Sequence, residues 1–150
     1  NGLDMLYIAY RAAARVATLR LGVGSVLPMG MTAIGRAYLW ALPASERGPL
    51  VTQLKAHAGA LAPTLEQGIR DSFSELEESG ACCVSDGYLR DTFGIALPVR
   101  LGRQGVLMSL SCGNAVLRPD LGAERKRIAP ALKKAATQLQ DLLSDDDGQP

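Results

Sequence analysis

The residues best suited to chemistry surround a predicted helix start at Thr32. Pro28 disfavours helix at the residue before it and Gly30 lets the backbone turn, so a loop should lead directly into this helix. The Thr32 hydroxyl can accept from the amide of Ile34 or Gly35, which leaves other N–H groups of the first turn open. Free amides and the positive end of the helix dipole suit a carboxylate or another anion. The sequence therefore predicts an anion site at this helix start.

The small residues of this helix allow two interpretations. Ala33 and Gly35 would let a ligand come close to the backbone. Alternatively, Gly35 and Ala37 are small only so that the helix can pack tightly on a sheet, and capped helix starts are present in most domains. The spacing alone leaves both interpretations open.

Cysteine and histidine offer little else for catalysis or metal binding. Cys82 and Cys83 are adjacent and Cys112 is alone, so neither a disulfide framework nor a metal spacing such as C-x-x-C is present. This usage indicates a reducing compartment, with the cysteines as small apolar residues on strands. His57 is the only histidine and lies where a helix should end, which is a common place for a polar or cationic residue.

Composition indicates a single domain. The chain has 150 residues, 47% of them apolar, which is enough for one substantial core. The net charge of +1 gives no basic field for nucleic-acid binding by this piece alone. Apolar runs end well short of the ~20 residues that a membrane span needs, and no secretory leader is visible in residues 1–10. Because the chain begins with Asn1 rather than Met, we interpret it as a domain of a longer protein.

The elements that must position the helix start form a mixed pattern. Strands are predicted at residues 3–11 and 15–22. Helices are predicted at residues 32–42, from residue 45 onward with Leu50, Val51 and Leu54 on one face, and from a capping-box pattern at 64–67 to Gly80.

The second half returns to strands and ends in a long helix. Strands are predicted at 81–85, 94–101 and 106–112, with turns at 86–87 and 102–105, and Pro98 indicates an edge or a bulge because it cannot donate to a ladder. A helix is predicted at 122–143, followed by an acidic tail. The fold class is therefore α/β of the α+β type, with helices gathered around one mainly antiparallel sheet.

An ordered set of short motifs is similar to a known family. Residues 27–37, with the pattern L-P-M-x-x-T-A-x-G-R-A, resemble the signature that opens the first large helix in the effector-binding domain of IclR-type transcriptional regulators. The resemblance continues through most of the chain in the same order, at Glu78-Ser79-Gly80, Asp86-Gly87, Gly94-Ile95-Ala96-Leu97-Pro98-Val99, Leu110-Ser111-Cys112-Gly113 and Ile128-Ala129-Pro130-Ala131-Leu132.

The resemblance implies a sensor rather than an enzyme. It implies a GAF-like effector-binding domain over residues 1–144, a flexible acidic tail at 145–150, and an N-terminal winged helix-turn-helix domain that binds operator DNA and is absent from this chain. Family members are usually dimers or tetramers, act in the cytoplasm, and bind a small metabolite, often an organic or aromatic acid, between the sheet and the loop before the first large helix. No metal, redox cofactor, catalysis or membrane partner is implied.

The resemblance also implies which residues form the effector site. The amides of Ala33 and Ile34 would donate to the ligand beside the Thr32 cap, which agrees with the capping argument. The loop would supply apolar walls from Leu27, Met29 and Met31, and the matching positions on the sheet are Val84, Thr92, Gly94, Ser111 and Gly113.

The sheet positions depart from the pattern of family members that bind small keto acids. Those members tend to have polar side chains there, including an acidic residue where this chain has Val84. Only Thr92 and Ser111 remain as obvious hydroxyls, which implies a larger, more apolar ligand with one anionic group, such as an aromatic or medium-chain carboxylate. Strand alternation adds Ser109 to the same face. An unpaired buried hydroxyl costs roughly 1–3 kcal/mol, so ligand, water or neighbouring backbone must satisfy these groups.

Two alternatives of other classes remain. An enzyme would use Cys82, Cys83 or Cys112 as nucleophile and His57 as base, although no orienting carboxylate stands at a motif spacing. An oligomerisation module would keep only a vestigial pocket filled by its own side chains.

Overall fold

Two short strands open the part of the chain that the structure, a computed structural model, describes, namely residues 2–13 and 21–145. The strands β1 (Asp4–Leu6) and β2 (Val26–Pro28) pair antiparallel, with Met5 opposite Leu27. The predicted strand at 3–11 is therefore right only at its start. The second prediction, at 15–22, falls mostly outside the described residues, and Leu21 and Gly22 are not in a strand. The strand lies instead at Val26–Pro28, in what was predicted as loop. Pro28 is tolerated because this two-stranded sheet leaves β2 an open edge.

The predicted helix start at Thr32 is confirmed. A 3-10 turn, η2 (Met29–Met31), leads into α1 (Ala33–Ala41), and Thr32 is the N-cap in extended conformation. The helix ends at Leu42, directly before Pro43, because the residue before a proline is disfavoured in helical conformation. Thr32 is thus the single residue between the turn η2 and the helix α1.

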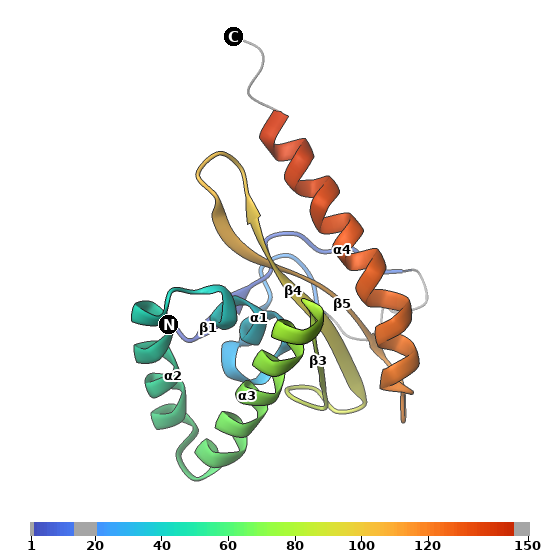
Figure 1. Ribbon diagram of the computed structural model, residues 1–150. Helices are drawn as coiled ribbons and strands as arrows, with labels where there is room; N and C mark the ends of the chain where they lie inside the picture. The colour runs from blue at the N-terminus through green and yellow to red at the C-terminus, as the bar shows by residue number, and fades with distance from the viewer. Residues whose placement is uncertain (1, 14–20, 146–150) are drawn as a thin grey trace.

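Two further helices follow α1 and form a hairpin beside it (Figure 1). The helix α2 (Ala44–Ala58) is joined by the 3-10 turn η3 (Gly59–Leu61) to α3 (Ala62–Ser79). The predicted capping box at 64–67 is wrong, because α3 begins two residues earlier, with Pro63 in the first turn, where its missing N–H costs nothing. The predicted stop is confirmed: Gly80 adopts the left-handed conformation and its N–H donates to the carbonyl of Leu76 (2.8 Å).

An ion-pair network ties the two helices of this hairpin together. Glu66 of α3 accepts from Lys55 Nζ of α2 at 2.7 Å and from Arg70 Nη2 within α3 at 2.8 Å. The hydrogen bond from Lys55, followed by that from Arg70, lowers the pKa of Glu66 below its ordinary value.

A three-stranded antiparallel sheet forms the second half, so the strands divide into two sheets rather than the single sheet predicted. Its order is β3 (Cys82–Ser85), β4 (Thr92–Leu101) and β5 (Val106–Ala115), and a turn at 102–105 joins the last two as predicted. Pro98 lies in the central strand, but the pairing of β4 with β3 ends at Ala96. At Pro98 the strand therefore has only β5 as a partner, which is why a proline fits there.

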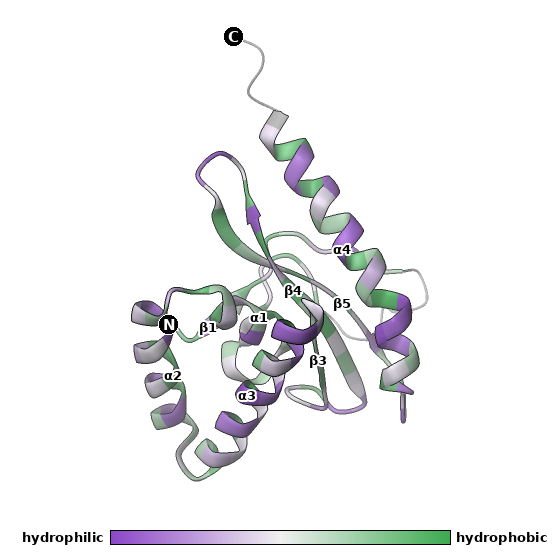
Figure 2. Ribbon diagram, in the orientation of Figure 1, coloured by the Kyte–Doolittle hydropathy of each residue, from purple (hydrophilic) through white to green (hydrophobic). Residues whose placement is uncertain are grey.

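The two faces of this sheet pack against different helices. On one face Ile95, Leu97 and Val99 pack against Ile128 and Leu132 of the long helix α4 (Leu121–Asp145), which runs alongside β4 and β5 (Figures 1 and 2). On the other face Cys82, Val84 and Ala96 pack toward α1 and α3. The predicted apolar stripe of α4, at Ile128, Leu132, Ala135, Leu139 and Leu142, is right only in part: Ile128 and Leu132 are buried, but Ala135 is exposed, Leu142 is 69% exposed, and Ala136 is buried instead. The predicted tail beyond Asp145 falls outside the described residues. None of the helices described combines the length and the apolar character needed to cross a membrane.

Candidate ligand-binding site

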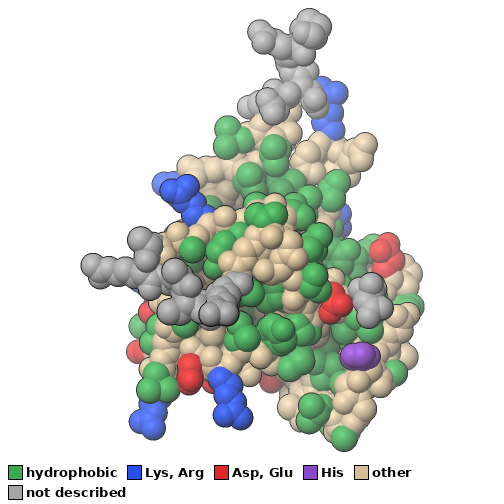
Figure 3. Space-filling view, turned by 180° about the vertical axis from the view of Figure 1, so that it is seen from behind, with side chains coloured by type: hydrophobic (Ala, Val, Ile, Leu, Met, Phe, Trp, Pro, Cys, Tyr) green, Lys and Arg blue, Asp and Glu red, His purple; other side chains and the backbone are tan. Residues whose placement is uncertain are grey.

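A cavity of about 660 Å³ lies between the start of α1 and the sheet face opposite α4. Its volume is within the range of small-molecule sites, roughly 300–1,000 Å³. The floor is the glycine-rich end of the sheet, where Gly94 pairs with Gly113 and Val84, and the walls come from residues 7–13 and from the loop before β4. Seen from behind, hydrophobic side chains gather over the middle of the molecule (Figure 3).

Eleven of the twelve residues predicted to contact a ligand line this cavity. They come from two parts of the chain that are far apart in sequence, the loop with its helix start and the three-stranded sheet, and they are Leu27, Met31, Thr32, Ala33, Ile34, Val84, Thr92, Gly94, Ser109, Ser111 and Gly113. Their contact with a ligand stays a prediction.

Met29 is the exception, and its prediction as a wall residue is wrong. It is only 4% exposed and packs in the core with Leu39, Leu54 and Ile69. The 3-10 turn explains the difference: with about three residues per turn, residues two positions apart point in different directions. Met31, 39% exposed, therefore borders the cavity while Met29 faces α2 and α3.

The helix start presents the free amides that its sequence predicts. The N–H of Gly35 donates to Thr32 Oγ1 at 3.3 Å, and this hydroxyl itself donates to the carbonyl of Pro28 at 2.9 Å. Within residues 2–13 and 21–145, no hydrogen bond satisfies the N–H groups of Ala33 and Ile34, which both border the cavity. The cap therefore uses one first-turn donor and leaves two for another acceptor.

The small residues of α1 are explained by packing. A Cβ atom at Gly35 would lie 1.9 Å from the carbonyl oxygen of Met29, so only glycine lets η2 approach the helix. Ala37 is fully buried in the cluster that joins α1 to Cys82 and Ala96. Packing on the sheet therefore explains Ala37, whereas Gly35 is required by the close approach of η2 rather than by the sheet. The free amides are a separate feature.

The predicted hydroxyls are mostly satisfied by the protein. Ser109 Oγ donates to the carbonyl of Ile34 at 2.8 Å, and Thr92 Oγ1 donates to the carbonyl of Leu89 at 2.6 Å. Burial raises the pKa of Tyr7, while a hydrogen bond with the Ser111 side chain opposes this shift. Ser109 thus connects the sheet to the start of α1 by a hydrogen bond. Tyr7 and Ser111 interact with each other through their side chains, and both line the cavity.

Several lining residues were missed. They come from the segment after β1 and from the turn before β4, and they include Tyr7, Tyr10, Arg11, Tyr88 and Leu89. The rings of Tyr7 and Tyr10 lie 5.7 Å apart. Their spacing, Tyr-x-x-Tyr-Arg, was visible, but local propensity attributes it to a strand, and nothing local shows that it covers a cavity.

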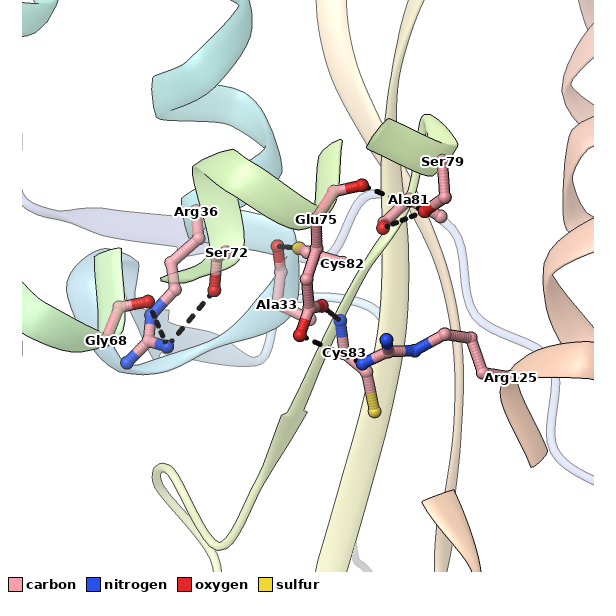
Figure 4. Close-up of polar contacts among 10 residues, drawn as sticks. All are labelled: Ala33, Arg36, Gly68, Ser72, Glu75, Ser79, Ala81, Cys82, Cys83 and Arg125. Carbon is pink, nitrogen blue, oxygen red and sulfur yellow. Dashed lines mark hydrogen bonds and ion pairs between the residues drawn. The ribbon is translucent and has the colours of Figure 1, made fainter. Parts of the chain in front are cut away.

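The cysteine and histidine residues are not arranged for nucleophilic catalysis. Burial raises the pKa of the Cys82 thiol to about 12, and its Sγ donates to the carbonyl of Ala33 at 3.5 Å (Figure 4). Burial also raises the pKa of Cys83, whereas Cys112 is exposed. His57 lies exposed in the last turn of α2. Among the described residues, no cluster of His, Cys, Asp or Glu could hold a metal ion.

The chain matches a family model over most of its length. The model of the bacterial transcriptional regulator IclR C-terminal domain matches residues 1–141. No curated protein matches the chain.

Solved structures of regulators have the same fold. An IclR family transcriptional regulator from Brucella abortus is 23% identical with a TM-score of 0.73, covering 90% of this chain and 53% of its own. The Thermotoga maritima IclR is 13% identical, with a TM-score of 0.74 and coverages of 95% and 58%. The chain thus spans about half the length of these structures.

One further structure contains a bound small molecule. It is a double mutant of the inducer-binding domain of the PobR transcription factor from Acinetobacter, in complex with 3-hydroxy benzoic acid. This domain is 20% identical to the chain, with a TM-score of 0.61 and coverages of 87% and 75%.

Proposed function

Because this chain belongs to the IclR family of bacterial transcriptional regulators, as its C-terminal, effector-binding domain, we propose that its cavity binds a small organic acid. The effector class we propose is an aromatic or medium-chain carboxylate. The observation that carries the proposal is the pair of unbonded amides, those of Ala33 and Ile34, on the wall of a cavity large enough for such a molecule.

The charge of the lining favours an anion. Among the described residues around the cavity, Arg11 is the one charged side chain, and no Asp or Glu lies among them. The α1 dipole places a partial positive charge at the same helix start. A carboxylate would therefore meet two N–H donors and a cationic side chain without a competing negative charge.

The remaining lining favours an apolar body on that acid. Leu27, Met31 and Val84 supply apolar walls, and tyrosines supply ring surfaces. Gly94 lines the cavity without a side chain of its own, so the floor is not narrowed there. The benzoic acid derivative bound by the PobR domain has this combination of ring and carboxylate, which supports the same class for this chain.

We further propose that the effector acts by shifting a population of domain arrangements. In the longer cytoplasmic protein, a homodimer or homotetramer, ligand binding at the start of α1 would change how the sensor domains meet and so how N-terminal winged helix-turn-helix domains bind operator DNA. Such coupling is typically ~1–3 kcal/mol and requires different ligand affinities for the two states.

A thermal-shift screen of this chain against organic and aromatic acids tests the proposal. A ligand at 100 times its Kd stabilises the folded state by about 2.7 kcal/mol, which is readily measured. Benzoate compared with benzamide isolates the contribution of the charge. If no acid raises the Tm, the chain is better described as an oligomerisation module with an unused pocket.

The variant Ala33→Pro then tests the amide contact itself. Proline fits the first position of a helix, so the substitution removes the N–H of residue 33 without breaking α1. We expect the affinity for the selected acid to fall about tenfold, the loss of one charge-assisted hydrogen bond. Ala44→Pro, the same change at the first position of α2, is the matched control. Unchanged affinity in Ala33→Pro would exclude this amide as a ligand contact.

A further inference from the structure

The side chain of Arg36 connects the cavity wall to the helix hairpin behind it. Arg36 lies on the first turn of α1 and runs away from the cavity toward α3 (Figure 4). Its Nε donates to the carbonyl of Gly30 in η2 at 2.9 Å. Its Nη1 donates to the carbonyl of Gly68 at 2.8 Å and to Ser72 Oγ at 3.2 Å, both on α3. One guanidinium therefore bonds η2 and α3 at the same time.

On α3, Gly68 and Ser72 leave room for the guanidinium group of Arg36 and supply acceptors for it. A Cβ atom at Gly68 would lie 2.6 Å from Arg36 Nη2, so a side chain there would displace the group. Ser72 is only 2% exposed, and among the described residues it is the one polar residue that is buried. Its hydroxyl accepts a hydrogen bond from Arg36. All three bonds use neutral oxygen acceptors. The fork of Arg36 is thus held by geometry rather than by an ion pair.

The position of η2 determines what the amides of Ala33 and Ile34 face. This turn immediately precedes the two amides, and Gly35 already packs on the carbonyl of Met29. Besides Arg36, the bonds that hold the turn are those from Met29 N–H to the carbonyl of Leu3 (3.0 Å) and from the Thr32 hydroxyl to Pro28. Arg36 supplies the hydrogen bonds to the α2–α3 hairpin, on which Met29 also packs.

We propose that Arg36 is a positioning residue, which clamps η2 to α3 and thereby holds the amides of Ala33 and Ile34 open toward the cavity. This inference deepens the proposed function and rests on it for the ligand. Because one side chain bonds both elements, a movement of η2 would strain the bonds of Arg36 to Gly30 or to α3. Arg36 is therefore also a contact between the cavity wall and α3, beside the packing of Met29 on Ile69.

The test compares Arg36→Lys with Arg125→Lys in amide hydrogen exchange without ligand. A lysine ammonium cannot reproduce the fork between Gly30 and α3. Arg125 is the matched control, because it also bonds α3, through Glu75 Oε1 at 2.9 Å, but from α4 on the other side. We expect Arg36→Lys to speed exchange of the Met29 and Gly35 amides at least about tenfold, with α3 and α4 amides unchanged, since local opening is measured separately from global unfolding.

The outcomes separate positioning from general stability. A uniform rise in exchange across all elements, or an equal change at Met29 and Gly35 in Arg125→Lys, would overturn the proposal. Benzoate is the ligand probe: we expect its affinity to fall about tenfold in Arg36→Lys and to stay unchanged in Arg125→Lys. If the wild type binds no benzoate, the proposed site fails for this acid, while the exchange rates still decide whether Arg36 holds the turn.

Discussion

Replacing Gly94 with alanine should raise stability and lower ligand affinity at once. Gly94 lies in β4 on the cavity floor, and an added Cβ atom would lie 3.7 Å from the Cβ atom of Ala33, an ordinary contact distance. Its backbone is not in the left-handed region, so alanine fits without strain. Glycine in a strand costs roughly 0.5–1 kcal/mol relative to alanine, which predicts a Tm about 1–4 °C higher in a chain of this size.

The same methyl group should obstruct the ligand. It would project from the cavity floor beside Ala33, whose amide we propose as a donor to the carboxylate. Forcing an extra methyl into a filled site costs typically about 1–3 kcal/mol, so affinity should fall between about five- and 150-fold. Calorimetric titration with the acid selected by the thermal-shift screen measures this loss.

Gly48→Ala provides the control for this experiment. Gly48 is an exposed residue within α2, and nothing lies near an added Cβ there. Alanine at this position should change stability by less than about 1 kcal/mol, because its higher helix propensity is opposed by contact with the ring of Pro49, and it should not affect affinity. The reasoning would be refuted if Gly94→Ala bound the acid as well as the wild type, or if it lowered the Tm.

Three further perturbations test other parts of the structure. Gly35→Ala should destabilise the fold by about 2–3 kcal/mol in urea denaturation, because the new Cβ would meet a backbone carbonyl at 1.9 Å, and an unchanged midpoint would contradict the close approach. Iodoacetamide at pH 7 should label Cys112 and spare Cys82, whose pKa is raised to about 12 by burial; labelling of Cys82 detected by mass spectrometry would contradict that burial. The pKa of Glu66 is lowered by its ion pairs, so its contribution is present above its ordinary pKa and is lost as the pH falls through the lowered value. Glu66→Gln should therefore have a lower Tm than the wild type at pH 7, with the difference disappearing as the pH falls below the lowered pKa, and equal Tm values at pH 7 would refute this.

Local chemistry predicts those parts of the fold that depend on neighbouring residues. The cap at Thr32, the helix stop at Gly80 and the hairpin turn at 102–105 each follow from one or two side chains acting on their own backbone. Strand alternation likewise places Ser109 and Ser111 on the face opposite α4. These features need no knowledge of what packs against them.

The features that sequence analysis missed depend on distant partners. The strand at Val26–Pro28 exists because Asp4–Leu6 pairs with it, and no local preference of Leu27-Pro28 indicates that partner. The start of α3 at Ala62 is likewise two residues ahead of the capping-box pattern, because a 3-10 turn feeds directly into it. Tyr10 and Arg11 become cavity walls only through the path of the chain after β1.

Met29 and Met31 show where family resemblance and local geometry diverge. Both residues are apolar and belong to the same loop signature, so both were predicted as walls of the site. The 3-10 turn separates them, sending Met29 into the core beside Leu54 and leaving Met31 at the cavity. The bond from Arg36 to the carbonyl of Gly30 lies between the two methionines, so the proposed clamp would also hold Met29 in the core and Met31 at the cavity. The signature at residues 27–37 therefore determines the position of the turn η2, and this position determines which of its side chains border the cavity.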